Sequence, residues 1–292
     1  MEDYIKAGKI AADAREYALS LVKENKTLLE TANKIEEFII KKDVTPAFPV
    51  SLAINEIAAH YTPSPDEKTI FNSEDLVKID IGVCINGCVT DTATTVEIKT
   101  NNNKELIKAS REALNEAIKI AQIGTELWQI GKIIEDTISS YGFNSIKNLS
   151  GHGLGDYEVH RKPTIPNFNN ENKETLQKGQ FITIEPFSTT GSGYVKEGKP
   201  STIYSIQRKQ SIRNPITKKI FDYVEKEYKI LPFSKRQLLK KFPLPQVNLA
   251  LKDLENNKIV KEYSQLPEKS NGLVSQHEHT LLIDEKVIVL TR

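Results

Sequence analysis

Apolar and polar residues alternate along two neighbouring runs of this chain, on either side of Asn86-Gly87. Both runs are rich in β-branched residues, and Asn-Gly is the strongest short signal for a two-residue hairpin turn. With that turn, Gly82 lies opposite Asp91, and the alternation of side chains puts Asp80 and Asp91 on one face. The two aspartates are then diagonal neighbours, about 7–8 Å apart at the backbone. The sequence therefore predicts a hairpin with two carboxylates on one face and an apolar core face on the other.

Small residues accompany the two aspartates on this face. Gly82 and Ala93 have little or no side chain, so we expect open space beside the carboxylates. Two carboxylates in such a space repel each other unless a positive charge lies between them. The pattern therefore predicts a site for divalent metal ions.

Periodicity elsewhere predicts an α+β fold. Helical spacing is present in five stretches, 3–24, 31–41, 51–60, 104–122 and 125–141. Thr125 is the expected N-cap of the last of these helices. Strand patterns follow at 157–160, 180–185, 201–206 and 274–283. Two blocks of two helices followed by strands indicate an internal duplication.

Residues 206–266 have a different pattern, with predicted helices at 216–228, 234–241 and 245–256 and a strand at 257–263 that we expect to be one arm of a hairpin. Three helices with a wing-like hairpin are typical of a winged-helix module. We predict an insertion into a catalytic body of residues 1–205 and 267–292, because the strand that follows belongs with the earlier sheet.

Composition adds an uneven charge to this organisation. Residues 208–262 carry 14 Lys and Arg against 6 Asp and Glu, a net charge of +8, whereas the whole chain carries +1. The rest of the chain therefore carries −7. A basic insertion in an acidic body indicates contact with a polyanion, and a solvated lysine-rich face explains the charge as well.

Several functional classes receive no support. The 292 residues include no apolar run of about 18 residues, and the first residues do not resemble a secretory signal. The two cysteines, Cys84 and Cys88, flank the hairpin turn on opposite faces, so we expect neither a disulfide nor a zinc pair. A reducing cytoplasm is the expected location.

The five histidines all lie outside the insertion. His152 is surrounded by three glycines, which we expect to let the backbone bend sharply and present the imidazole. His160 follows eight residues later, just before Lys162-Pro163, and His60 follows the proline-rich loop.

Two glutamates interrupt predicted strands. Glu185 ends an apolar run before Pro186, where burial without a partner would cost several kcal/mol. Glu278 shares a face with Gln276 and Thr280, so His277 and His279 are expected to point away from it and to be structural. One histidine and four carboxylates form a ligand set that suits a pair of divalent ions such as Mn, Fe, Co or Zn.

The ordered set Asp80, Asp91, His152, Glu185 and Glu278, with His60 and His160 interposed, resembles methionine aminopeptidase. The supporting strings begin at Pro46-Ala-Phe-Pro, Asp80-Ile-Gly, Asp91-Thr-Ala, Ser150-Gly-His, Ile184-Glu-Pro and Glu278-His-Thr. The helical insertion, and the lack of cysteine in residues 51–55, resemble the type 2 subfamily in its short archaeal form.

This resemblance implies a pita-bread fold, a pseudo-symmetric antiparallel sheet covered by helices. It implies that Asp80 binds one metal, that Asp91 and Glu278 bridge two metals, and that His152 and Glu185 complete the second site. His60 and His160 would contact the scissile peptide. The residues implied in the methionine pocket are Phe48, Val159 and Tyr263.

The implied activity is removal of the N-terminal methionine from nascent proteins when the next residue is small. Two ions would generate a bridging hydroxide, with Glu185 as proton shuttle and His160 at the oxyanion. The implied partners are nascent chains and, through the basic insertion, the ribosome. A monomer is expected, with no membrane association.

Two alternatives remain open at this stage. A proline-specific aminopeptidase or prolidase shares the fold and the ligands, although such relatives usually carry an additional N-terminal domain. A metal-free binding protein on the same scaffold is the alternative from outside the enzymes, but such relatives lose ligands that are intact here.

Overall fold

Strands β4 (Leu76–Ile85) and β5 (Cys88–Glu97) form the predicted hairpin in the predicted register, with Ile85 opposite Cys88 and Gly82 opposite Asp91. The structure, a computed structural model, describes residues 1–292. Asn86 and Gly87 form the turn, and both have positive φ, as a tight hairpin turn of this kind requires. The sequence pattern therefore gave the correct geometry for the two aspartates.

The hairpin lies within a nine-stranded antiparallel sheet with the order β1-β4-β5-β16-β9-β7-β8, in which β2 also pairs with β4 and β17 with β16. The other strands of this sheet are β1 (Thr45–Pro46), β2 (Ser51–Ile54), β7 (Ser150–Gly155), β8 (Glu158–Pro166), β9 (Phe181–Ile184), β16 (Glu278–Leu282) and β17 (Ile288–Val289).

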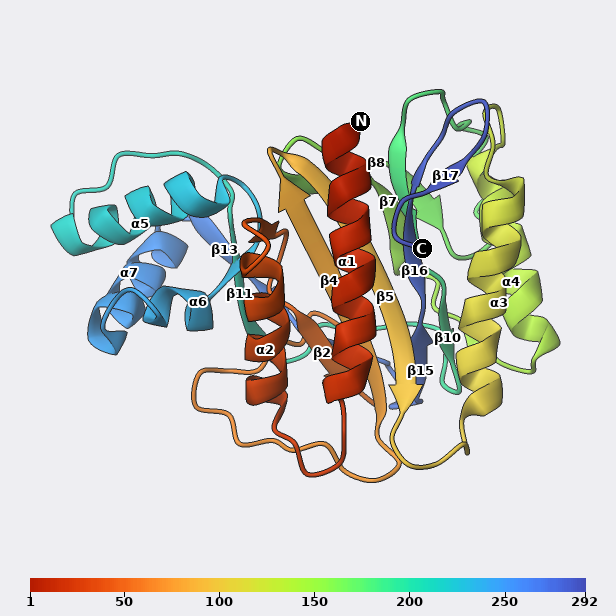
Figure 1. The fold of residues 1–292 in the computed structure, drawn as a ribbon, viewed down its shortest axis with the longest axis horizontal. Coiled ribbons are helices and arrows are strands. Elements are labelled where there is room, and N and C mark those ends of the chain that lie inside the picture. Colours follow the sequence, from red (N-terminus) through yellow and green to blue (C-terminus); the bar gives the residue numbers. More distant parts are fainter.

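Two helix pairs cover one face of this sheet (Figure 1). Helices α1 (Glu2–Leu21) and α2 (Leu28–Ile40) pack on the half that contains β4, and their core includes Ile79 and Ile81. Helices α3 (Lys104–Ile120) and α4 (Leu127–Ser140) pack on the other half. The α+β class is confirmed, and each half repeats the order of two helices followed by strands.

The start of α4 differs from the prediction. Its N-cap is Glu126, which forms a reciprocal capping box with Gln129, and not Thr125. The hydroxyl of Thr125 instead donates to the carbonyl of Ile120 at 2.6 Å. The helix begins one residue later because this hydroxyl closes the preceding turn.

The predicted helix at 51–60 is wrong. This segment forms β2 and the short strand β3 (Ile57–Ala59), separated by Asn55 with a φ of 52°. Asn55 accepts from the amide of Leu76 at 2.9 Å and donates to Asp75 at 3.0 Å, which ties the turn to β4. Pairing with β4 outweighs the helical propensity of the Leu and Ala residues here.

The predicted strand at 274–283 is broken at His277. Its first part, β15 (Val274–Gln276), pairs with β10 (Phe187–Thr189), and β10 also pairs with β6 (Asn144–Ser145). Its second part, β16, joins the large sheet between β5 and β9. The break lies directly beside Glu278.

The predicted insertion, residues 206–266, is called the basic segment below and contains helices α5 (Pro215–Tyr228), α6 (Lys235–Leu239) and α7 (Leu244–Asn256). Its strands β12 (Phe233–Ser234) and β13 (Val260–Ser264) pair with β11 (Pro200–Ile206), which leads into it. The antiparallel partner of β13 is β11, which precedes α5, so the wing-like hairpin with a neighbouring strand does not form. After β13, β14 (Leu266–Pro267) pairs with β3 and returns the chain to the body.

None of the helices combines the length with the apolar character that crossing a membrane requires.

Candidate metal centre

One row of paired residues crosses four strands and defines the floor of the candidate site. Ser51 pairs with Asp80, Asp80 with Ala93, and Ala93 with Glu278. Residues opposite each other in an antiparallel sheet project to the same face. Asp80 and Glu278 therefore flank Ala93, whose small side chain leaves room between the two carboxylates.

Asp91 lies two residues before Ala93, on the same face. Its amide donates to Thr280 Oγ1 at 2.7 Å, and the same hydroxyl donates to the carbonyl of Asp91 at 2.7 Å. This reciprocal contact fixes β5 against β16 beside the carboxylates. The pairing explains why Asp91 and Glu278, far apart in the sequence, meet at this site.

His152 belongs to a paired strand and not to a bend, so the predicted role of its neighbouring glycines is wrong. Gly151 and Gly153 lie in β7 without positive φ. A β-carbon on Gly151 would overlap the carbonyl of Thr183, and one on Gly153 would overlap that of Lys162. These glycines let two neighbouring strands approach β7 closely.

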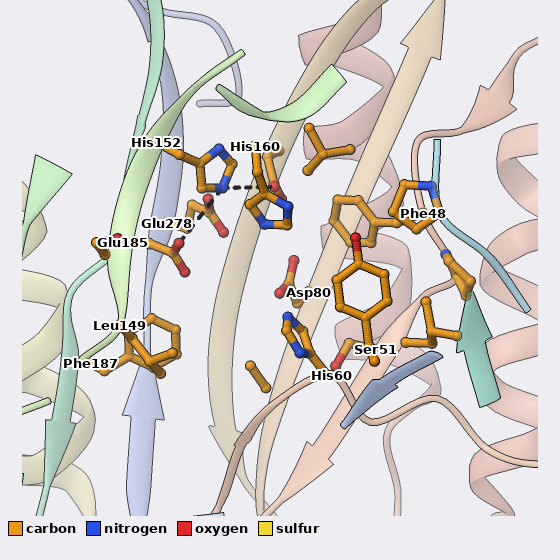
Figure 2. A pocket seen from close by; sticks show the side chains of 18 of the residues that line it. Phe48, Ser51, His60, Asp80, Leu149, His152, His160, Glu185, Phe187 and Glu278 are labelled. Atoms are coloured by element: carbon orange, nitrogen blue, oxygen red, sulfur yellow. Dashed lines mark ion pairs between the residues drawn. The ribbon is translucent and has the colours of Figure 1, made fainter. Parts of the chain in front are cut away.

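Glu185 follows directly after β9, whose last residue, Ile184, pairs with His279. The carbonyl of Glu185 accepts from Asn167 Nδ2 at 3.1 Å, which fixes the backbone just before Pro186. The side chain of Glu185 thereby lies next to Glu278 at the same end of the sheet (Figure 2).

The four carboxylates lie beside one another, with Asp91 and Glu278 buried and Asp80 and Glu185 half-buried. Burial raises the pKa of Asp80 to about 6, and burial together with the neighbouring carboxylates raises the pKa values of Asp91, Glu185 and Glu278 well above their usual range. One oxygen of Asp80, one of Asp91 and one of Glu278 have no hydrogen-bond partner. A buried acidic cluster with unpartnered oxygens requires a compensating positive charge.

His152 is in the protonation state of a metal ligand. Burial, followed by the nearby His160, lowers its pKa to about 3, so the ring is neutral at ordinary pH. Nδ1 lies 3.3 Å from the carbonyl of Gly153 and donates to it, which leaves the Nε2 lone pair free. Nε2 lies 3.9 Å from Asp91 and 3.7 Å from Glu185 (Figure 2).

These residues fit a divalent metal ion. Ligand atoms of Asp91, His152 and Glu278 all lie within 4.8 Å of one another. Carboxylate oxygens with one neutral imidazole nitrogen form a donor set that first-row divalent ions accept. The unpartnered oxygens are the atoms that such an ion would satisfy.

The cluster opens into a pocket of about 240 Å³. All ten residues that the sequence singled out line this pocket: Phe48, His60, Asp80, Asp91, His152, Val159, His160, Glu185, Tyr263 and Glu278. In Figure 2, His160 and His60 lie on either side of Asp80, between Glu185 and Glu278 on one side and Phe48 on the other. The pocket therefore joins an acidic end to apolar walls.

The histidines above the cluster are positioned by neighbours. Nδ1 of His60 lies 3.2 Å from the carbonyl of Ser264, and its ring meets Tyr263 edge-on at 5.2 Å between centroids. Burial and the nearby His160 lower the pKa of His60 to about 4, so its ring is a neutral hydrogen-bonding group. Partial desolvation lowers the pKa of His160, which is more exposed than His60.

The space beside Gly82 is not empty, contrary to the expectation. A β-carbon on Gly82 would overlap the ring of Phe48. The glycine therefore admits an aromatic pocket wall, and only Ala93 leaves free room beside the carboxylates.

Several functional positions were missed by the sequence analysis. Pro232, from the basic segment, and Leu149, Phe187 and Ile203, from the body, complete the apolar walls. Gln276 Nε2 lies 3.5 Å from Asp80 and 3.3 Å from Glu185, so it holds two of the carboxylates together. The shared face of Gln276 and Glu278 was the available signal for this contact.

The predicted separation of His277 and His279 from the pocket agrees with their contacts. His277 Nδ1 lies 2.9 Å from the hydroxyl of Ser110 on α3, and His279 Nδ1 lies 2.9 Å from that of Thr291. Neither histidine lines the pocket.

Comparisons with known sequences agree with this geometry. The model of metallopeptidase family M24 matches residues 2–228. The chain is 42% identical to a methionine aminopeptidase of Pyrococcus abyssi over 100% of this chain and 99% of the relative. It is 41% identical to a methionine aminopeptidase of Methanocaldococcus jannaschii, over 99% of this chain and 97% of the relative.

Solved structures show the same fold at lower identity. A thermophilic Arx1 superposes with a TM-score of 0.87 at 16% identity, covering 99% of this chain and 90% of that one. A methionine aminopeptidase from Thermotoga maritima gives a TM-score of 0.72 at 24% identity, covering 100% and 96%. A prolidase from Pyrococcus furiosus gives 0.62 at 21% identity, and this chain covers 63% of it. The pita-bread fold prediction is confirmed, and the chain belongs to metallopeptidase family M24.

Proposed function

We propose that this protein is a methionine aminopeptidase that removes the N-terminal methionine from proteins and peptides whose next residue is small. The observation that carries the proposal is that a cluster of carboxylates with unpartnered oxygens adjoins a pocket of about 240 Å³ with apolar walls. An unbranched thioether side chain fits apolar walls of this kind. The full-length relatives named methionine aminopeptidase support the same assignment.

The proposed cofactor is a pair of divalent ions, Mn, Fe, Co or Zn, held by Asp80, Asp91, His152, Glu185 and Glu278. Four carboxylates and one imidazole offer more donor atoms than a single ion needs. When bound, such ions polarise the scissile carbonyl and lower the pKa of water. They also offset the burial and the mutual repulsion that together raise the pKa values of Asp91 and Glu185.

The chain's own residues have distinct proposed tasks. Glu185, at the edge of the cluster and in the pocket, carries a proton from the attacking water to the leaving amine. His160 donates to the developing oxyanion, and His60, fixed by the Ser264 carbonyl, holds the amide of the scissile bond. Phe48, Val159 and Tyr263 enclose the methionine side chain.

The test is release of free methionine from Met-Ala-Ser, after chelation and separate restoration of Mn, Fe, Co or Zn. We expect metal-dependent cleavage of this peptide, and none of acetyl-Met-Ala-Ser, because the free amine fixes the substrate end. Cleavage of Ala-Pro-Ser instead would identify a proline-specific hydrolase. No cleavage with any metal would leave a binding protein on this scaffold as the better assignment.

Within this activity we propose an archaeal-like member of the type 2 subfamily, acting as a monomer in the cytoplasm. The insertion between the body strands and its contribution of Pro232 to the pocket support this subtype. Replacing the insertion with a short loop should open one wall and raise KM for Met-Ala-Ser. An unchanged KM would contradict a substrate-enclosing role.

We propose further that the basic segment docks weakly on the ribosome, where nascent chains emerge. Its net charge of +8 supports contact with a polyanion. Reversing three of its exposed cations, Arg213, Lys219 and Lys252, to Glu should reduce co-sedimentation with ribosomes at low salt. The matched control reverses Lys119, Lys173 and Lys286, which are exposed on the body. Equal loss in both variants would contradict a docking role for the insertion.

A further inference from the structure

A second cavity lies on the face of the sheet opposite the metal centre. It is a groove of about 390 Å³ between α1 and α3, floored by β5 and the start of β16. In Figure 1 these two helices cover the sheet on either side of the strands that form the floor. The groove shares β5 and β16 with the metal centre, and its lining includes Ala93, which also belongs to the row of residues that floors that centre, so the two sites adjoin across β5.

Positive side chains converge on this groove from three parts of the chain. Arg15 comes from α1, Arg111 from α3, and Arg292 from the end of the chain. Glu16 is the single acidic side chain in the lining. Two of the five histidines, His277 and His279, belong to the floor.

The arginine charges are poorly compensated. Arg15 has only 12% of its side chain exposed, and its carboxylate contact is Glu16, 3.5 Å away and 67% exposed. Arg111 has Glu112 at 3.8 Å as its carboxylate contact. Both distances exceed the roughly 2.7–2.9 Å of a direct charge-assisted hydrogen bond. Burial also lowers the pKa of Arg15, because it disfavours the charged guanidinium, and a bound anion would favour that charged form.

The other polar contacts of Arg15 fix it in place. Its guanidinium donates to Thr92 Oγ1 at 2.7 Å and to the carbonyl of Thr291 at 2.9 Å. Arg15 is thereby pre-positioned beside the floor, whereas Arg111, with 54% of its side chain exposed, is free to close over a ligand. Guanidinium groups of this kind suit tetrahedral oxyanions, which they bind through paired hydrogen bonds.

We propose that this groove binds an oxyanion of the phosphate class, inorganic phosphate or the phosphate of a monoester, through Arg15, Arg111 and Arg292. The site is separate from the metal centre. It lies behind Glu278, since His277 and His279 precede and follow that residue in the chain.

The histidines serve as built-in reporters for the test. Zinc-loaded enzyme with ¹⁵N-labelled histidine is titrated with sodium phosphate at constant pH and ionic strength, with chloride as the exchanged anion. We expect saturable shifts of the His277 and His279 ring signals, with His60, His152 and His160 unchanged. Shifts confined to the last three would place phosphate at the metals and overturn the proposal, as would no shift at all.

A variant tests the arginines directly. Arg111→Gln combined with Arg292→Gln should weaken phosphate binding at least about tenfold, or 1.4 kcal/mol, and both positions are exposed enough to leave the fold intact. The matched control is Lys119→Gln, an exposed cation on α3 outside the groove. Native-like affinity in the double variant would also overturn the proposal. Titration with glycerol phosphate in parallel identifies the source, since tighter binding of the ester points to a monoester ligand.

Discussion

Two buried clusters of charged residues in this protein are built on opposite plans. At the metal centre, four carboxylates lie together with unpartnered oxygens on Asp80, Asp91 and Glu278. Between α6 and α2, Arg236 forms two hydrogen bonds with Glu36, at 2.7 and 2.8 Å. The first cluster offers unpartnered carboxylate oxygens to a positive charge from outside the chain, whereas the second contains its own positive charge. Burial of charge alone therefore does not mark a functional site, whereas several carboxylates gathered without a positive partner do.

The Arg236–Glu36 pair lies at the contact between the basic segment and the body. Arg236 donates to Asn33 at 2.8 Å and to Thr62 at 3.0 Å, close to His60 in the chain. It fastens the basic segment to the body on the side where Pro232 reaches the pocket. The Arg236–Glu36 cluster pairs its charges within the chain, with only Arg236 Nε left without a hydrogen-bond partner, and forms a structural joint, whereas the carboxylate cluster is the candidate binding site.

The largest expected effect is on metal binding and activity at the cluster of carboxylates and His152. His152→Ala should remove metal and nearly all activity, with a loss of metal affinity beyond the 10–100-fold typical of an outer-shell partner. His277→Ala is the matched control, since it lies on the back of the same sheet and should keep both. Metal content by mass spectrometry and methionine release measure the two outcomes. Full metal content in His152→Ala would show that the histidine is not a ligand.

Substitutions in the Arg236–Glu36 cluster should change the free energy of unfolding. Arg236→Met leaves Glu36 buried without its partner and should lower the free energy of unfolding by about 3–5 kcal/mol. Adding Glu36→Leu should recover most of this loss, because no charge then remains buried. Urea unfolding measures both variants. A double variant as unstable as the single one would mean that packing, rather than charge, dominates this joint.

Removal of metal by a chelator tests whether the metal centre and the Arg236–Glu36 cluster stabilise the fold independently. Removing metal present at 100 times its Kd should lower the free energy of unfolding by about 2.7 kcal/mol. The additional loss from Arg236→Met should be the same with and without metal, because the two clusters share no partners. A clear difference between the two values would show that the joint and the metal centre are coupled.

A further buried carboxylate, Glu268, gives the smallest expected effect. Glu268 accepts from the amides and hydroxyls of Ser192 and Ser270 and from the amide of Gly272. Burial alone would raise its pKa, but these hydrogen bonds lower it to about 2. Glu268→Gln should lower the free energy of unfolding by about 1.5 kcal/mol, as for loss of a hydrogen-bonded charge.

The pH dependence of this contribution follows from its sign. The folded pKa lies below the unfolded value, so the stabilisation is present above about pH 4.3 and is lost as the pH falls towards 2. The difference in Tm between native protein and Glu268→Gln should therefore shrink between these pH values. A constant difference would assign the effect to packing.

The sequence predicted the acidic site better than its surroundings, for identifiable reasons. Asn86-Gly87 sets the hairpin register locally, and that register alone puts Asp80 and Asp91 together. The segment 51–60 failed because its strands depend on pairing with β4 and β14, which lie far away in the sequence.

The roles of Gly82 and of the glycines beside His152 were predicted wrongly for a related reason. A glycine has the same letter whether it bends the backbone or admits a neighbour, and here Gly151 and Gly82 admit Thr183 and Phe48. The contribution of Pro232 to the pocket depends on how the basic segment packs, which no local pattern reports.

The row Ser51–Asp80–Ala93–Glu278 has a consequence for how the protein assembles its site. A slip of one residue between β4 and its neighbours would turn Asp80 towards the helices and Ile79 or Ile81 into the pocket. Because Ile79 and Ile81 are fully buried against α1 and α2, the apolar core rejects that slipped arrangement. Helices α1 and α2 contribute no residue to the pocket, but their packing against Ile79 and Ile81 keeps the strands in the register that aligns the metal ligands. A substitution that disturbs this core should therefore weaken metal binding first.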